Sequence, residues 1–169
     1  MFSVLLFLDT SGSMHGEKIF ALSYAVERFI HGLRDIAFSQ EPMIASFTFG
    51  GKLTQTPFVP LSQLALWSIE ARGATLLSEA LTKAQTLAAS STVCVLISDG
   101  LVTNGDFAKI RFDCQKYAIA VGSDADKLML SRFTGANERV FPTYESEMLP
   151  GYILQREYNT MERSNGILY

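Results

Sequence analysis

Residues 2–14, FSVLLFLDTSGSM, contain the pattern that decides the fold. Residues 2–8 are almost entirely apolar and rich in branched and aromatic side chains, which predicts a central β-strand buried on both faces. The run stops at Asp9, and the next residues carry hydroxyl groups at Ser11 and Ser13 around a glycine that permits a tight turn. Because the run is short and no basic segment precedes it, we expect a strand and not a signal peptide.

The rest of the chain alternates between strand and helix patterns. Residues 17–35 have apolar positions at spacings of three and four, which predicts an amphipathic helix. Residues 43–49 predict a strand, and Gly50-Gly51 followed by residues 52–56 predicts a hairpin with a primed turn and a short antiparallel edge. Further strands are expected at residues 92–98, 117–121 and 139–141, with helices from Thr75, at 107–112 and at 125–133. This order predicts an α/β, doubly wound, Rossmann-like and mainly parallel six-stranded sheet with one antiparallel edge strand and helices on both faces.

Composition limits the classes of partner. The chain has 169 residues, 48% hydrophobic and 18% charged, with a net charge of -3. That balance gives no basic field for nucleic acid, and no run of about 18 apolar residues predicts a membrane span. Cys94 and Cys114 lack the spacing of a disulfide or zinc framework, so we expect reduced thiols in a cytoplasmic protein. One domain is expected over residues 1–150, with a peripheral tail at 151–169.

Two of the predicted strands end in an aspartate. Ligands of doubly wound folds bind beyond the carboxyl ends of the strands, where Asp9 and Asp99 stand. Asp9-x-Ser11-x-Ser13, together with Thr75 at the start of a helix and Asp99 after a later strand, resembles the metal ion-dependent adhesion site (MIDAS) of von Willebrand factor A (VWA) domains. The resemblance covers about residues 2–150, and the combination is far more specific than any single piece.

The resemblance implies a metal site and a partner. Ser11, Ser13 and Thr75 would bind Mg²⁺ directly, with Mn²⁺ or Ca²⁺ as alternatives, while Asp9 and Asp99 would act mostly through water. Neutral hydroxyl ligands leave a hard cation short of anions and leave room for an outside oxygen. The N-terminus of the helix near Glu17 favours an incoming anion as well. We therefore expect a protein partner that supplies an Asp or Glu carboxylate.

The segment at residues 118–126, AIAVGSDAD, resembles bacterial tellurite-resistance-type VWA proteins. That resemblance implies a cytoplasmic protein of a bacterial stress or tellurite-resistance system. The chain departs from some of those relatives because its C-terminal part lacks their metal-binding cysteine pattern, which puts the transfer of their partners in doubt.

Each piece of the pattern also has a plain structural interpretation. Ser13 and Thr75 are suitable helix caps, and Asp99-Gly100 is a common turn. A metal-dependent hydrolase or phosphatase is the alternative function, because a bound metal activates water. A phosphatase with an aspartate nucleophile needs a second aspartate where Ser11 stands, and the glycine-rich nucleotide loops and the nucleophile elbow are missing from the sequence. We therefore expect no enzymatic activity, and no catalytic role for His15.

Overall fold

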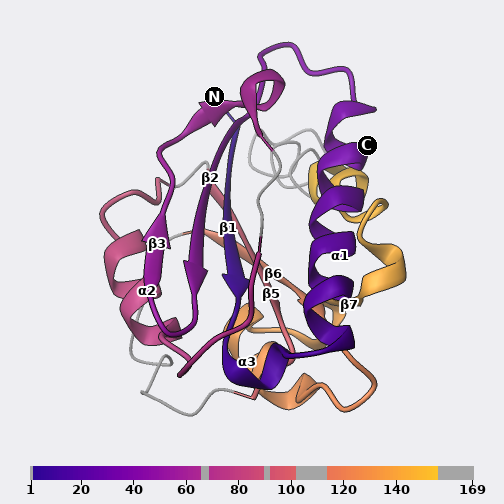
Figure 1. The fold of residues 1–169 in the computed structure, drawn as a ribbon. Coiled ribbons are helices and arrows are strands. Elements are labelled where there is room, and N and C mark those ends of the chain that lie inside the picture. Colours follow the sequence, from indigo (N-terminus) through magenta and orange to yellow (C-terminus); the bar gives the residue numbers. More distant parts are fainter. Residues whose placement is uncertain (1, 66–68, 90–91, 102–113, 156–169) are drawn as a thin grey trace.

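The computed structural model describes residues 2–65, 69–89, 92–101 and 114–155 (Figure 1). The strands are β1 Ser3–Asp9, β2 Met43–Phe49, β3 Leu53–Gln55, β4 Val59–Pro60, β5 Thr92–Ser98, β6 Gln115–Ala120 and β7 Val140–Pro142. The α-helices are α1 Glu17–Arg34, α2 Leu77–Ala84 and α3 Lys127–Thr134, and residues 149–155 are also helical. Short 3-10 turns are η1 Gly12–Met14, η2 Leu61–Gln63, η4 Asn137–Arg139 and η5 Thr143–Glu145.

The sheet has the predicted α/β architecture. Its strands follow the order β3-β2-β1-β5-β6-β7, and all neighbours are parallel except β3, which runs antiparallel to β2. The described residues contain one strand more than expected, because Val59 and Pro60 of β4 also pair with β2. The two-sided burial predicted for the first apolar run is confirmed, since β1 is buried from Val4 to Asp9.

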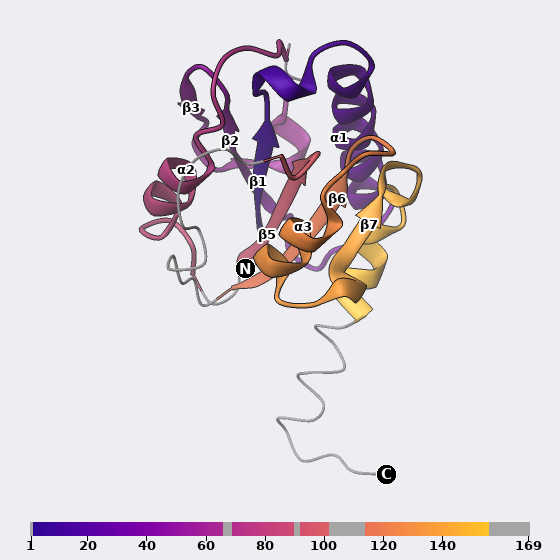
Figure 2. The same ribbon diagram turned by 90° about the horizontal axis from the view of Figure 1, so that it is seen from below.

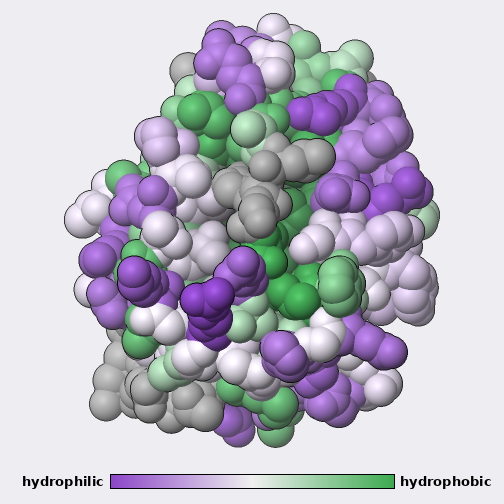
Figure 3. Space-filling view, viewed as in Figure 1, coloured by the Kyte–Doolittle hydropathy of each residue, from purple (hydrophilic) through white to green (hydrophobic). Residues whose placement is uncertain are grey.

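Helices cover both faces of the sheet (Figures 1 and 2). On one face Leu6 and Leu8 of β1 share a core with Phe29 of α1. On the other face Phe7 shares a core with Leu81 of α2 and Phe133 of α3. Apolar residues also gather in the middle of the surface drawn in Figure 3, between α1 and the strands. Neighbouring residues of β1 therefore face opposite cores, and this strand contributes to the packing on both faces of the sheet.

The hairpin between β2 and β3 differs from its prediction. Phe49 pairs with Leu53, so three residues connect the strands, and neither Gly50 nor Gly51 has the positive φ of a primed turn. The prediction of a primed turn was wrong, whereas the antiparallel edge strand is confirmed. Gly50 serves a different purpose, because a Cβ there would lie 2.4 Å from the carbonyl oxygen of Thr10. The glycine permits close approach of two loops.

The packed structure continues beyond residue 150. Ile153 is only 1% exposed and belongs to the core under α1, while the Tyr152 ring packs against Phe141 with ring centroids 5.2 Å apart. The first residues of the expected tail are therefore part of the packed unit, and the division at residue 150 itself stays a prediction. The rest of that tail and the helix expected at residues 107–112 lie outside the described residues. Among the helices that are described, none has the length and apolar character required to cross a membrane.

Candidate metal centre

The two predicted aspartates stand at the same edge of the sheet. β1 and β5 are parallel neighbours in which Leu8 pairs with Ile97, so Asp9 and Asp99 leave the sheet together at the carboxyl ends. In Figure 1 this is the lower edge, where β1 leads into the turn before α1. Both aspartates are 0% exposed. The buried carboxylates therefore require compensation from nearby groups.

Neutral donors surround the Asp9 carboxylate. The backbone N–H of Ser11 donates to Asp9 Oδ1 at 3.0 Å, and the Ser98 hydroxyl donates to Asp9 Oδ2 at 2.5 Å. Burial raises the pKa of Asp9 above its ordinary value, against the lowering effect of these hydrogen bonds, and the negative charge of Asp99 raises it further. The hydrogen bonds hold the carboxylate in place without neutralising it.

Asp99 has a cationic partner that the sequence did not reveal. Its Oδ1 accepts the backbone N–H of Leu101 at 3.0 Å, and its Oδ2 lies 3.0 Å from Lys18 Nζ. The same ammonium lies 2.8 Å from Asp124 Oδ2. Burial lowers the pKa of Lys18, but the hydrogen bonds to Asp124 and Asp99 outweigh it, so that pKa is raised. Hydrogen bonding to Lys18 lowers the pKa of Asp124.

The two serines of the motif adjoin each other. Ser11 Oγ and Ser13 Oγ are 3.1 Å apart, with Ser11 buried and Ser13 exposed. The capping interpretation of Ser13 does not apply, because α1 begins at Glu17 with Gly16 at its N-cap. Thr75 likewise does not cap α2, which begins at Leu77, so the prediction of a helix opening at Thr75 was two residues early.

Backbone hydrogen bonds bring the Thr75 loop against the serine loop. The N–H of Gly12 donates to the carbonyl oxygen of Gly73 at 2.8 Å, and the N–H of Arg72 donates to that of Thr10 at 2.7 Å. Gly73 has a φ of +73°, and a Cβ there would lie 2.4 Å from Gly51 Cα. Thr75, two residues further on, is buried. Hydrogen bonds thus connect Asp9, Ser11 and Ser13, while Asp99 leaves the neighbouring strand and the loop of Thr75 lies beside the serine loop. Their convergence on a single ion stays a prediction.

Comparisons with known proteins support the fold. No family model and no curated protein matches this sequence. Among solved structures, the ArnB paralog VWA2 from Sulfolobus acidocaldarius is 21% identical with a TM-score of 0.64, and the match covers 89% of this chain and 43% of that one. The manganese-loaded TRAP protein of Plasmodium vivax is 15% identical with a TM-score of 0.68, covering 88% and 71%. Proximal thread matrix protein 1 of the mussel byssus, with a zinc-occupied MIDAS motif, is 14% identical with a TM-score of 0.63, covering 88% and 46%.

The chain has the fold of a von Willebrand factor A domain. It spans less than half the length of the archaeal and mussel chains. At these identities the likeness establishes the fold and leaves the function of this chain to be argued from its own residues.

A cavity of about 760 Å³ lies beside Lys18, near the candidate metal centre. Its lining includes His15, Lys18, Asp124 and Lys127. His15 is exposed and lies between η1 and α1, next to the strand ends. None of the five predicted metal residues lines the cavity, and its link to the candidate centre is Lys18, which contacts Asp99.

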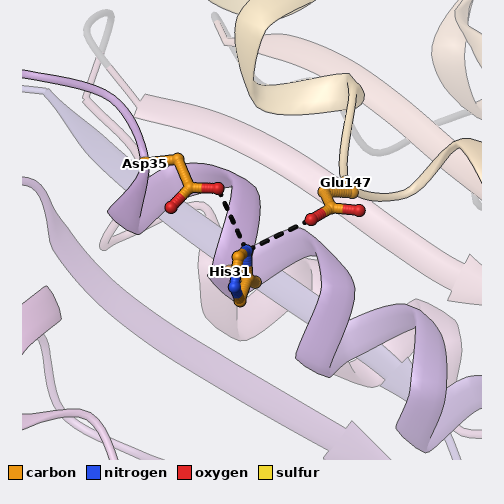
Figure 4. Close-up of side chains that lie close together, drawn as sticks. All are labelled: His31, Asp35 and Glu147. Carbon is orange, nitrogen blue, oxygen red and sulfur yellow. Dashed lines mark ion pairs between the residues drawn. The ribbon is translucent and has the colours of Figure 1, made fainter.

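A second group of ionisable residues lies at the C-terminal end of α1, away from the carboxyl ends of β1 and β5 (Figure 4). His31 Nδ1 is 3.1 Å from Asp35 Oδ2 and 3.2 Å from Glu147 Oε1. This group is the one His, Cys, Asp and Glu cluster with metal-ligand spacing in the described part of the chain. Arg28 also pairs with Glu147, so a fixed cation already balances that carboxylate. We interpret the group as an ion-pair network that connects α1 to the segment before residue 149.

Cys94 and Cys114 lie together, although their spacing did not predict it. Their Sγ atoms are 2.9 Å apart, Cys94 in β5 and Cys114 just before β6. The hydrogen bond with Cys114, followed by burial, raises the pKa of Cys94 well above its ordinary value. Both cysteines lie near the starts of β5 and β6, at the opposite edge of the sheet from Asp9 and Asp99, so the pair takes no part in the candidate site.

Proposed function

We propose that this VWA domain binds a divalent metal ion through Asp9, Ser11, Ser13, Thr75 and Asp99 and uses it to hold a partner protein. The observation that carries the proposal is the pair of fully buried carboxylates, Asp9 and Asp99, at one edge of the sheet. Buried carboxylates are stable only when they are paired or bind a cation.

The ion pairs at this edge leave a shortage of positive charge. Among the described residues, Lys18 is the cation in contact with these carboxylates, and it is shared between Asp99 and the third carboxylate, Asp124. Asp9 accepts hydrogen bonds from the neutral groups of Ser11 and Ser98, and burial, followed by the charge of Asp99, raises its pKa. A divalent ion supplies the charge that the chain itself lacks.

The oxygen atoms fit an ion of the magnesium type. Mg²⁺ binds oxygen at about 2.1 Å in octahedral geometry, which places adjacent ligands about 3 Å apart. Ser11 Oγ and Ser13 Oγ are 3.1 Å apart, so both suit neighbouring positions on one ion. Hydroxyl and carboxylate oxygens are the ligands of hard cations, which favours Mg²⁺, with Mn²⁺ or Ca²⁺ as alternatives.

The same ligand set favours an acidic partner. Ser11, Ser13 and Thr75 are neutral, so an ion held by their hydroxyls retains affinity for an anion from outside. The N-terminus of α1 begins at Glu17, directly after the serine loop, and its dipole favours negative charge nearby. The partner then supplies an Asp or Glu carboxylate. Two proteins of similar fold hold manganese or zinc, which supports the proposed metal binding.

We propose a role in a bacterial tellurite-resistance-type or stress system in the cytoplasm. This part of the proposal rests on the resemblance of residues 118–126 to tellurite-resistance-type VWA proteins.

We propose an interaction module and not an enzyme, because the sequence lacks both the second aspartate of aspartate-nucleophile phosphatases and the nucleophile elbow of hydrolases.

Capture of partners from a bacterial lysate, with Mg²⁺ or with EDTA, tests the function. We expect a partner that is retained with Mg²⁺, released by EDTA, and lost with Asp9→Ala and Thr75→Ala. Asp35→Ala is the matched control, because it removes an exposed carboxylate from the His31 network and leaves the strand ends unchanged. Retention that is equal with EDTA and in all three variants would show that partners dock independently of the metal.

A further inference from the structure

Lys18 is positioned between a buried and an exposed carboxylate. Its Nζ lies 3.0 Å from Asp99 Oδ2 and 2.8 Å from Asp124 Oδ2, while its side chain is 18% exposed. The Asp99 side chain is 0% exposed, whereas that of Asp124 is 62% exposed. The ammonium is thus held by one carboxylate that belongs to the candidate metal centre and by one that does not.

The contact occupies an oxygen that the metal centre needs. Asp99 Oδ1 accepts the fixed backbone N–H of Leu101, whereas the partner of Oδ2 is a side chain that is able to move aside for an ion or its bound water. Lys18 Nζ lies on that oxygen. Two cations that share one carboxylate oxygen repel each other, and the repulsion is strong where burial limits screening by water.

Packing keeps the ammonium near both carboxylates. A Cβ at Gly122 would lie 3.0 Å from Lys18 Cε and 2.8 Å from Asp124 Oδ1. The lysine side chain therefore passes close to the loop that carries Asp124, and Gly122 leaves the room for it. Because Lys18 Nζ already contacts Asp124 Oδ2, loss of the contact with Asp99 leaves the ammonium paired with an exposed carboxylate.

We propose that Lys18 is a tethered competitor of the divalent ion at Asp99 and lowers the metal affinity of the centre, with Asp124 as the carboxylate that receives the ammonium when the ion binds. The inference rests on the proposed metal-binding function and adds a means of setting the affinity. Metal binding becomes an exchange in which one cation displaces another. Lys18 also pairs with Asp99 when no ion is bound, which stabilises the ion-free fold.

Titration calorimetry with Mg²⁺ and with Mn²⁺, on the wild type and on Lys18→Met, tests the inference. Methionine keeps the apolar stem and removes the charge, so we expect the dissociation constant to fall roughly tenfold or more. Lys18→Arg is the control that keeps the charge, and it should bind within a few-fold of the wild type. Thermal melts give a second readout, in which Lys18→Met lowers the melting temperature without metal and shows a larger rise on adding metal.

Asp124→Asn tests the role of the exposed carboxylate. With Asp124 neutral, Asp99 holds Lys18 alone, and the metal affinity should fall. Loss of a nearby negative charge would also weaken binding by itself, and the double variant Lys18→Met with Asp124→Asn separates the two causes. If Asp124 acts through Lys18, Asp124→Asn has a smaller effect in the Lys18→Met background than in the wild type.

The outcomes separate this inference from the proposed function. Tighter binding by Lys18→Met, with a reduced effect of Asp124→Asn in that background, supports the inference. If the wild type binds metal and Lys18→Met binds it with equal or lower affinity, the inference is overturned and the metal function stands. Binding by neither the wild type nor Lys18→Met would overturn the metal function itself. Because Asp124 is exposed, Asp124→Asn should fold even if Lys18→Met does not, and an unchanged or higher metal affinity of Asp124→Asn would by itself overturn the inference.

Discussion

Replacing Gly73 with alanine should damage the candidate site through the backbone alone. Gly73 has a φ of +73°, and a Cβ at this position would lie 2.4 Å from Gly51 Cα and 2.8 Å from Gly51 N. Its carbonyl oxygen accepts the N–H of Gly12, within the serine loop. Any movement that relieves the contact with Gly51 therefore also shifts the loop that leads to Thr75.

The magnitude follows from two costs. A residue with a side chain in the left-handed region costs about 1–2 kcal/mol. Overpacking against backbone that has no rotamer to change costs about 1–3 kcal/mol more. The free energy of unfolding should fall by about 2–5 kcal/mol, which lowers the melting temperature of a domain of this size by roughly 4–20 °C, at about 2–4 °C per kcal/mol.

Gly51→Ala is the matched control for this experiment. The same added methyl group at Gly51 meets its nearest atom, the carbonyl oxygen of Arg72, at 3.4 Å, which is an ordinary contact, and Gly51 has no positive φ. Melting followed by circular dichroism should show a change within about 2 °C for Gly51→Ala. Calorimetry with Mg²⁺ should show weaker binding for Gly73→Ala alone. Equal melting temperatures and equal metal affinities in the two variants would refute the argument.

Three further outcomes are expected. Mg²⁺ at one hundred times its dissociation constant should raise the stability by about 2.7 kcal/mol, and this gain should be missing in Asp9→Ala. Burial raises the pKa of Asp9, so between its unfolded and folded pKa values the folded chain retains a proton that the unfolded chain has released. The free energy of unfolding of the metal-free protein should therefore fall as the pH rises through that range. Denaturant melts of Asp9→Asn should lack this loss. Because the Sγ atoms of Cys94 and Cys114 are 2.9 Å apart, a mild disulfide oxidant should oxidise both thiols together to a disulfide. In Cys114→Ser, the Cys94 thiol should survive the oxidant and remain detectable in a thiol titration of the denatured protein.

Most of the framework of the site was predictable because strand ends determine it. The apolar runs before Asp9 and Asp99 form the parallel neighbours β1 and β5, so both aspartates reach one edge. The helix after the serine loop was also predicted correctly, since the spacing of its apolar residues matches α1. Local patterns succeeded where burial and periodicity select one structure.

Contacts between distant segments were not predictable from local patterns. Lys18 and Asp124 are 106 positions apart, and the sequence gives no sign that one ammonium joins Asp124 to Asp99. Gly50-Gly51 was interpreted as a primed turn because glycine permits positive φ, whereas the structure uses Gly50 for close approach to Thr10. The same residue type meets either requirement, and only the tertiary structure decides between them.

The most direct test of the metal centre is calorimetric titration of Mg²⁺ and Mn²⁺ into the wild type, Asp9→Ala and Asp35→Ala. Asp35 belongs to the His31 network on α1, so its variant separates the two groups of acidic residues. The proposal predicts one ion bound per chain in the wild type and in Asp35→Ala, with binding abolished in Asp9→Ala. Undiminished binding in Asp9→Ala, or binding that Asp35→Ala abolishes, would contradict it.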